Sequence, residues 1–109
     1  MTNEELNNLQ TEAYEHLWNG RHRLALSAAE KVYEYRPDDS DSAICLAWAC
    51  LENGHPSKAI EYANLAVELK GDSAKTRFFR SYLLTRMGIY EGAIADIEKT
   101  MPKEKNLLS

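Results

Sequence analysis

Three aromatic residues recur at a fixed interval of 34 positions: Tyr14, Trp48 and Tyr82. Aromatic side chains bury a large apolar area, and Tyr and Trp also keep one polar atom. A row of such side chains therefore suits the non-covalent binding of an apolar or amphipathic segment rather than covalent chemistry.

Residues able to support catalysis or metal binding are few and poorly spaced. The three histidines, His16, His22 and His55, form no metal-ligand pair with a cysteine or carboxylate on one helical face. The sequence has no phosphate loop, dinucleotide fingerprint or nucleophile elbow. Cys45 and Cys50 are five positions apart on one predicted helix, which turns them about 140° away from each other. We therefore expect buried free thiols, no enzyme activity, no cofactor and no metal.

The aromatic residues belong to a longer repeat of 34 residues. Its frame is set by three glycines, Gly20, Gly54 and Gly88. Small residues precede these glycines by seven positions and alanines follow them by five: Ala13, Ala47 and Ser81 before, Ala25, Ala59 and Ala93 after. Each unit predicts a helical hairpin, because glycine ends a helix by adopting positive φ, and small residues let two helices cross closely.

The repeat predicts one all-α domain over residues 1–109. Three units, each an antiparallel helix-turn-helix hairpin, cover about residues 6–39, 40–73 and 74–101. The remaining residues, 102–109, are a C-terminal tail.

The two ends of the stack carry their own signals. Thr2 and Glu5 predict a capping box at the start of the first helix. In the last helix the pattern places Ile94 inward and Asp96 outward, so we expect this helix to cap the stack itself.

The small residue, the turn glycine, the following alanine and the closing Pro37 resemble the tetratricopeptide repeat family over about residues 6–101. The family's early tryptophan is replaced here, so the repeats are degenerate. The resemblance implies a right-handed superhelical stack in which the first helix of each unit lines a concave groove. It also implies a non-catalytic role in binding a protein or peptide. At the family's clamp positions for a C-terminal carboxylate only Lys75 matches, so we do not expect that specificity.

The same register places ten residues in the groove: Gln10, Tyr14, Trp18, Ile44, Trp48, Glu52, Lys75, Phe78, Tyr82 and Arg86. Asn7, Leu17, Asp41, Cys45 and Phe79 share this face. The aromatic row either lines the groove or fills the seam between repeats, and the sequence leaves both interpretations open. The charged residues on this face are expected to be solvated.

Composition narrows the choice of partner. The chain has 13 Lys and Arg against 17 Asp and Glu, a net charge of −4, which opposes binding to nucleic acid. The longest apolar run has nine residues, well short of a membrane span. With no apolar leader at the N-terminus and no disulfide framework, we expect a cytoplasmic protein.

The function favoured by the sequence is that of an adaptor, co-chaperone or assembly factor that holds an apolar or amphipathic segment. One alternative is a self-associating scaffold, in which a homodimer forms through the aromatic surface or the Leu107 and Leu108 end. Another is a small secretion-type chaperone for an apolar partner segment.

Overall fold

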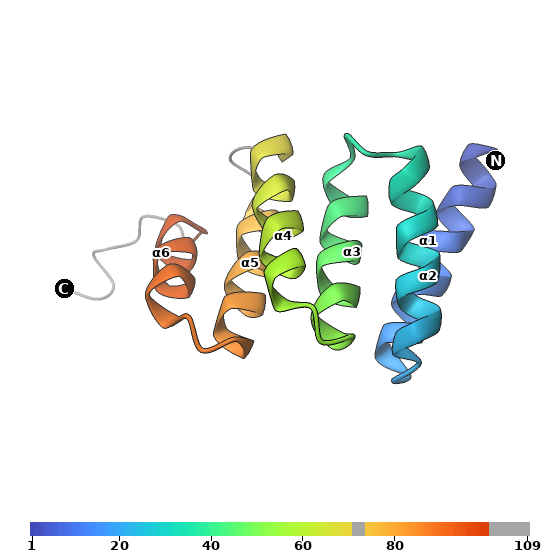
Figure 1. The fold of residues 1–109 in the computed structure, drawn as a ribbon. Coiled ribbons are helices and arrows are strands. Elements are labelled where there is room, and N and C mark those ends of the chain that lie inside the picture. The colour runs from blue at the N-terminus through green and yellow to red at the C-terminus, as the bar shows by residue number, and fades with distance from the viewer. Residues whose placement is uncertain (71–73, 101–109) are drawn as a thin grey trace.

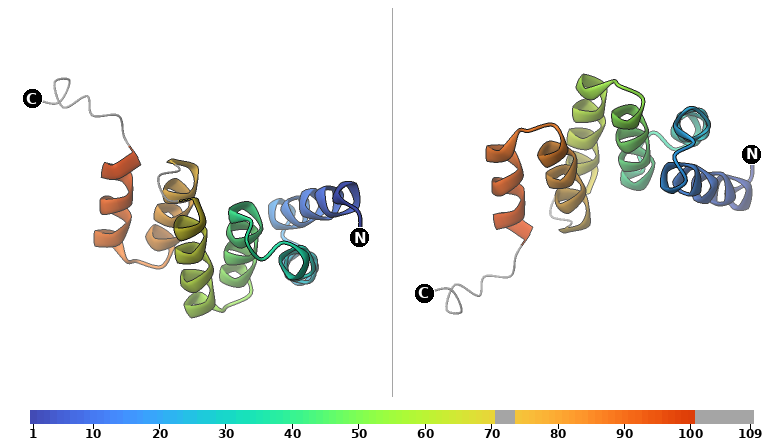
Figure 2. Two further views of the ribbon diagram at one scale, coloured as in Figure 1. Left: turned by 90° about the horizontal axis from the view of Figure 1, so that it is seen from above. Right: turned by 90° about the horizontal axis from the view of Figure 1, so that it is seen from below.

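The structure, a computed structural model, describes residues 1–70 and 74–100. Over these residues the chain forms helices joined as three antiparallel hairpins, one after another along a row (Figures 1 and 2). The helices are α1 (Asn3–Trp18), α2 (His22–Tyr35), α3 (Ser40–Glu52), α4 (Pro56–Lys70), α5 (Ala74–Arg86) and α6 (Tyr90–Thr100). The predicted all-α stack of helix-turn-helix hairpins is confirmed.

The turn inside each hairpin is built on one of the repeat-framing glycines. Gly20, Gly54 and Gly88 have φ of 75°, 79° and 79°, in the left-handed region that side chains disfavour. After Gly20, the backbone N–H of Arg21 donates to the carbonyl of His16 at 2.8 Å, and equivalent bonds follow the other two glycines. These are Schellman caps, which satisfy the last carbonyls of each first helix. The predicted role of the three glycines is confirmed.

The start of α1 is closed by the predicted capping box. The Thr2 hydroxyl accepts from the backbone N–H of Glu5 at 3.1 Å, and the Glu5 carboxylate accepts from the backbone N–H of Thr2 at 2.9 Å. Two donors that a helix start leaves unpaired are thereby satisfied.

The first helices of the hairpins lie closer together than the second helices do. Helix α3 contacts both α1 and α5, whereas α2 and α4, both described, have no direct backbone contact. The space between α2 and α4 is bridged by Tyr33 and Tyr62, whose ring centroids are 5.2 Å apart. Because the inner elements of a curved stack are the more closely spaced ones, α1, α3 and α5 line its inner side.

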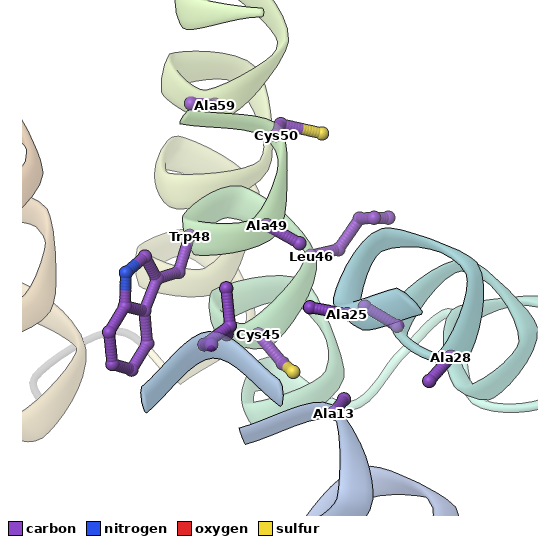
Figure 3. Close-up of a cluster of buried hydrophobic side chains, with 11 residues drawn as sticks. Ala13, Ala25, Ala28, Cys45, Leu46, Trp48, Ala49, Cys50 and Ala59 are labelled. Atoms are coloured by element: carbon purple, nitrogen blue, oxygen red, sulfur yellow. The ribbon is translucent and has the colours of Figure 1, made fainter. Parts of the chain in front are cut away.

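The core is centred on α3, the helix with neighbours on both sides. Every residue from 42 to 50 is buried. Small residues allow the close crossing of α1 and α2: Ala13 and Ala25 are both fully buried in one cluster with Leu46 (Figure 3). In this view Trp48 leaves α3 on the side away from Leu46 and Ala25.

Helix α6 directs Asp96 rather than Ile94 toward the stack, the reverse of the expectation for these two residues. Ile94 is 54% exposed, while Asp96 is 2% exposed. The reason is Arg80 of α5, which donates to both carboxylate oxygens of Asp96 at 2.6 and 2.5 Å and to the Asn64 side chain of α4 at 3.1 Å. A buried carboxylate needs such partners, so the ion pair fixes the inward face of α6. The tail at 102–109, with Leu107 and Leu108, lies outside the described residues.

Candidate functional site

Six aromatic side chains surround a cavity of about 310 Å³ on the inner side of the stack. They come from the first helices of all three hairpins: Tyr14, Trp18, Trp48, Phe78, Phe79 and Tyr82. The volume lies at the lower end of the range of roughly 300–1,000 Å³ for small-molecule sites, so the cavity has room for one or two large side chains.

Trp48 is the centre of this aromatic cluster. Its ring lies 6.1 Å from Tyr14 and 5.4 Å from Trp18 on α1, and 6.5 Å from Tyr82 on α5, measured between centroids. The contacts with Trp18 and Tyr82 are edge to face, at 88° and 81°. Aromatic pairs prefer such edge-to-face contacts, in which the two ring planes are nearly perpendicular.

Exposure of the rings rises from the centre of the cluster outward. Trp48 is 9% exposed and belongs to the core cluster, whereas Trp18 is 78% exposed. Tyr14 and Phe79 are half-buried, and Tyr82 and Phe78 are exposed. The two interpretations of the aromatic row therefore apply to different rings. Trp48 fills the seam between repeats, and the flanking rings present their surface to solvent.

Two ion pairs join α3 to α5 at either end of the aromatic cluster. Lys75 Nζ lies 2.9 Å from Asp41 Oδ1 near the helix starts, and Arg86 pairs with Glu52 near the helix ends. In both pairs the partners are 34 positions apart, so they occupy the same place in successive repeats. These charges are therefore not isolated: each has a partner on the neighbouring repeat, while the Lys75 and Asp41 side chains remain exposed to solvent, as expected. The pairing could have been predicted from the sequence, because residues of opposite charge lie 34 positions apart, at the same place in successive repeats.

The Arg86 side chain connects this charge pair with the aromatic cluster. Its guanidinium carbon lies 5.7 Å from the centroid of the Tyr82 ring, a cation–π distance. Its hydrogen bond to Glu52 lowers the pKa of that carboxyl below the ordinary value and raises the pKa of Arg86. His22 Nε2, on α2, lies 3.8 Å from the other oxygen of Glu52. At neutral pH the rim of the cavity therefore carries a fixed guanidinium–carboxylate pair.

Other residues expected in the groove lie elsewhere. Ile44 is 2% exposed and packs with Ala43 and Ala66 between α3 and α4, so it offers no surface to a ligand. Gln10 is half-buried and lies 3.5 Å from the hydroxyl of Ser42. Phe79 of α5 also packs against the cluster that contains Ile44, whereas Phe78, at the equivalent position one repeat later, is exposed.

The two cysteines are buried free thiols inside α3. Burial raises the pKa of Cys45 to about 12, against the opposing effect of a hydrogen bond with Tyr14, and burial also raises the pKa of Cys50. The thiolate is the reactive form of cysteine, so neither side chain is suited to nucleophilic chemistry at neutral pH.

Residues 1–70 and 74–100 contain no group of three or more His, Cys, Asp or Glu side chains placed to hold a metal ion. Over the same part of the chain, no helix combines the length and the apolar character needed to cross a bilayer. The arrangement on the inner side is thus an apolar, aromatic cavity with a paired charge at each end.

Paired helices in a stack with an aromatic inner side define a helical-repeat module of the tetratricopeptide type. The family model described as anaphase-promoting complex, cyclosome, subunit 3, matches residues 18–100. The chain belongs to this family of tetratricopeptide-like repeats. The comparison with curated proteins gives no match.

Solved structures with this fold include MamA, residues 41 to the end, from Desulfovibrio magneticus RS-1. It is 23% identical, with a TM-score of 0.76 over 93% of this chain and 57% of the MamA chain. PcrH, solved in complex with the chaperone-binding region of PopB, is 12% identical, with a TM-score of 0.77 over 92% of this chain and 81% of the PcrH chain. The chain thus spans little more than half of the MamA structure. At these identities the likeness concerns the fold.

Proposed function

We propose that this protein is a non-catalytic binding module whose inner aromatic cavity holds an apolar side chain of a partner protein or peptide. The observation that carries the proposal is the partly open cavity lined by six aromatic side chains from three helices. Apolar, aromatic-lined cavities with few polar groups are the usual sites of ligand binding, and exposed aromatic side chains are enriched at interaction hot spots.

The partner segment is apolar or amphipathic, since the cavity wall has no charged side chain that could pair with a charge on the inserted part of the ligand. PcrH shares the fold and is solved with a segment of PopB, which supports a peptide as the type of ligand.

The finer role is that of an adaptor, co-chaperone or assembly factor. A secretion-type chaperone is the more specific version, with the same kind of ligand. The two buried free thiols agree with a cytoplasmic, reducing environment.

Affinity capture with matched variants tests the proposal. The protein is immobilised and used to capture partners from its own host, beside the double variant Trp18→Ala, Phe78→Ala and the control double variant Leu24→Ala, Tyr35→Ala on α2. All four residues are exposed, so both variants are expected to keep the wild-type circular dichroism spectrum. A partner captured by wild type and control, but lost with the Trp18 and Phe78 variant, supports the cavity. A partner retained by that variant contradicts it.

A second candidate function is self-association through the C-terminal end of the stack. Ile89, Tyr90 and Ile94 are exposed around the start of α6, whereas most exposed residues of α1 at the other end are polar. Exposed apolar side chains gathered at one end of the described stack favour a two-fold contact between like ends. Sedimentation equilibrium of wild type and Ile94→Glu tests this candidate: a dimer abolished by Ile94→Glu supports it, and a wild-type monomer at high concentration contradicts it.

A further inference from the structure

Both charge pairs beside the cavity expose the cation more than the anion. The Arg86 side chain is 38% exposed against 16% for Glu52, and the Lys75 side chain is 58% exposed against 41% for Asp41. His22 Nε2 lies 3.8 Å from the second oxygen of Glu52. In both pairs the cation therefore offers an approaching chain a larger exposed fraction of its side chain than the carboxylate does.

Among the described residues, each cation uses only part of its hydrogen-bonding capacity. A guanidinium has five N–H donors, and Arg86 directs one nitrogen to Glu52 and its face to Tyr82. An ammonium has three donors, and Lys75 donates one hydrogen bond to Asp41. The remaining donors are available to a carboxylate of a guest without breaking either ion pair, and bonds to charged partners are the stronger kind.

The spacing of the two cations sets a distance for that guest. Lys75 and Arg86 are eleven residues apart on α5, which corresponds to about 16 Å along the helix. Phe78, Phe79 and Tyr82 lie between them. An extended chain covers about 13 Å in four residues at roughly 3.3 Å each, and residues four apart point to the same face, so acidic side chains at that spacing can reach both cations.

We propose that the preferred guest is an extended segment with a large apolar residue at its centre and an acidic residue two positions away on each side, so that all three side chains point to the same face. The apolar side chain enters the aromatic cavity, and the carboxylates meet Arg86 and Lys75. This inference rests on the proposed function and adds the charge pattern of the partner to it.

Three capped peptides test the charge pattern: Glu-Ala-Phe-Ala-Glu and its counterparts with Gln or Lys at both ends. Binding to the full chain is followed by NMR at the indole N–H groups of Trp18 and Trp48, the two tryptophans of the sequence. We expect the Glu peptide to bind about fivefold more tightly than the Gln peptide at low salt, and the Lys peptide to bind most weakly. The difference between Glu and Gln peptides is expected to shrink at high salt because of screening.

A charge-swapped variant is the matched control. Glu52→Arg combined with Arg86→Glu keeps an ion pair but puts a carboxylate at the more exposed position. With this variant the preference for the Glu peptide is expected to fall, while affinity for the Gln peptide stays within about twofold. Lys75→Gln, at the most exposed of the four positions, gives the same comparison in a variant whose fold is under no strain.

The outcomes separate this inference from the function on which it rests. If all three peptides bind equally, or the Lys peptide binds best, the charge pattern is wrong and the aromatic cavity stands. If the preference for Glu is undiminished in both the charge-swapped variant and Lys75→Gln, Arg86 and Lys75 are not its source, and the inference is overturned. If no peptide shifts either indole, the cavity itself does not bind, and the proposed function fails with the inference.

Discussion

The indole of Trp18 contacts that of Trp48 edge to face, with centroids 5.4 Å apart and ring planes at 88°. One ring is exposed and the other is nearly buried, although both belong to one aromatic cluster. This contact joins the core of α3 to the open surface of α1. It also means that the two tryptophans respond differently to substitution.

Trp48→Ala is expected to destabilise the fold. Truncation of a buried tryptophan removes its contacts with three rings and leaves a void, at a cost of about 3–5 kcal/mol. Trp18→Ala is expected to cost less than about 1 kcal/mol, because most of the side chain is in solvent. Urea denaturation followed by circular dichroism measures both values. Equal costs for the two substitutions would contradict the assignment of Trp48 to the core.

Gly54→Ala is expected to cost about 1–2 kcal/mol through backbone strain alone. Gly54 has φ of 79°, and no atom lies within 4 Å of the position where a Cβ would stand. Gly54→Asn is the matched control, since asparagine adopts positive φ more readily, and it is expected to cost less than Gly54→Ala. Thermal unfolding compares the two. A larger cost for the bulkier asparagine would indicate a steric origin instead.

Arg80→Gln is expected to cost about 3 kcal/mol, because it removes the guanidinium that pairs with the buried Asp96 carboxylate. The double variant Arg80→Gln, Asp96→Asn also removes the buried negative charge and is expected to be more stable than Arg80→Gln alone. A double-mutant cycle measured by chemical denaturation gives the coupling. Additive costs would show that the pair does not hold α6 in place.

The Glu52 and Arg86 pair makes stability depend on pH in the acid range. The pKa of Glu52 is lowered from its ordinary value of 4.5, first by the hydrogen bond from Arg86. A lowered folded-state pKa contributes stability that is fully present above the unfolded value and is lost as pH falls through the folded value. The stability difference between wild type and Glu52→Gln is therefore expected to be constant near neutrality and to shrink below pH 4.5. A difference that persists unchanged to pH 2, in denaturation curves across this range, would contradict it.

The thiols of Cys45 and Cys50 are expected to react with a disulfide reagent only when the chain opens. Both are buried, and the pKa of Cys45 is raised to about 12. At pH 8 the labelling rate is therefore expected to rise with sub-denaturing urea in step with unfolding. Fast labelling of the native protein would contradict the buried position of α3.

Local signals in the sequence were sufficient for much of the fold. Gly20, Gly54 and Gly88 end helices because positive φ is a backbone property that glycine reveals directly. Ala13 and Ala25 mark the close helix crossing for a similar reason, since only small side chains fit there. These features depend on one residue and its immediate neighbours.

Features that depend on contacts between repeats were harder to predict. A helical register applied alike to all units put Ile44 in the groove, but in the middle repeat Ile44 belongs to a cluster against which Phe79 of α5 packs. Ile94 and Asp96 were reversed because the partner of Asp96 is Arg80, a contact that no periodic pattern reveals. In each case the deciding partner lies on another helix.

The most direct test of the central claim is to locate the bound apolar side chain by intermolecular NOEs, using the uncharged peptide Gln-Ala-Phe-Ala-Gln. The cavity predicts NOEs from the guest's phenyl ring to Trp18, Tyr82 and Phe78 on the inner side of the stack. NOEs confined to the outer helices or to Tyr90 and Ile94 on α6, or no NOE at saturating peptide, would contradict it.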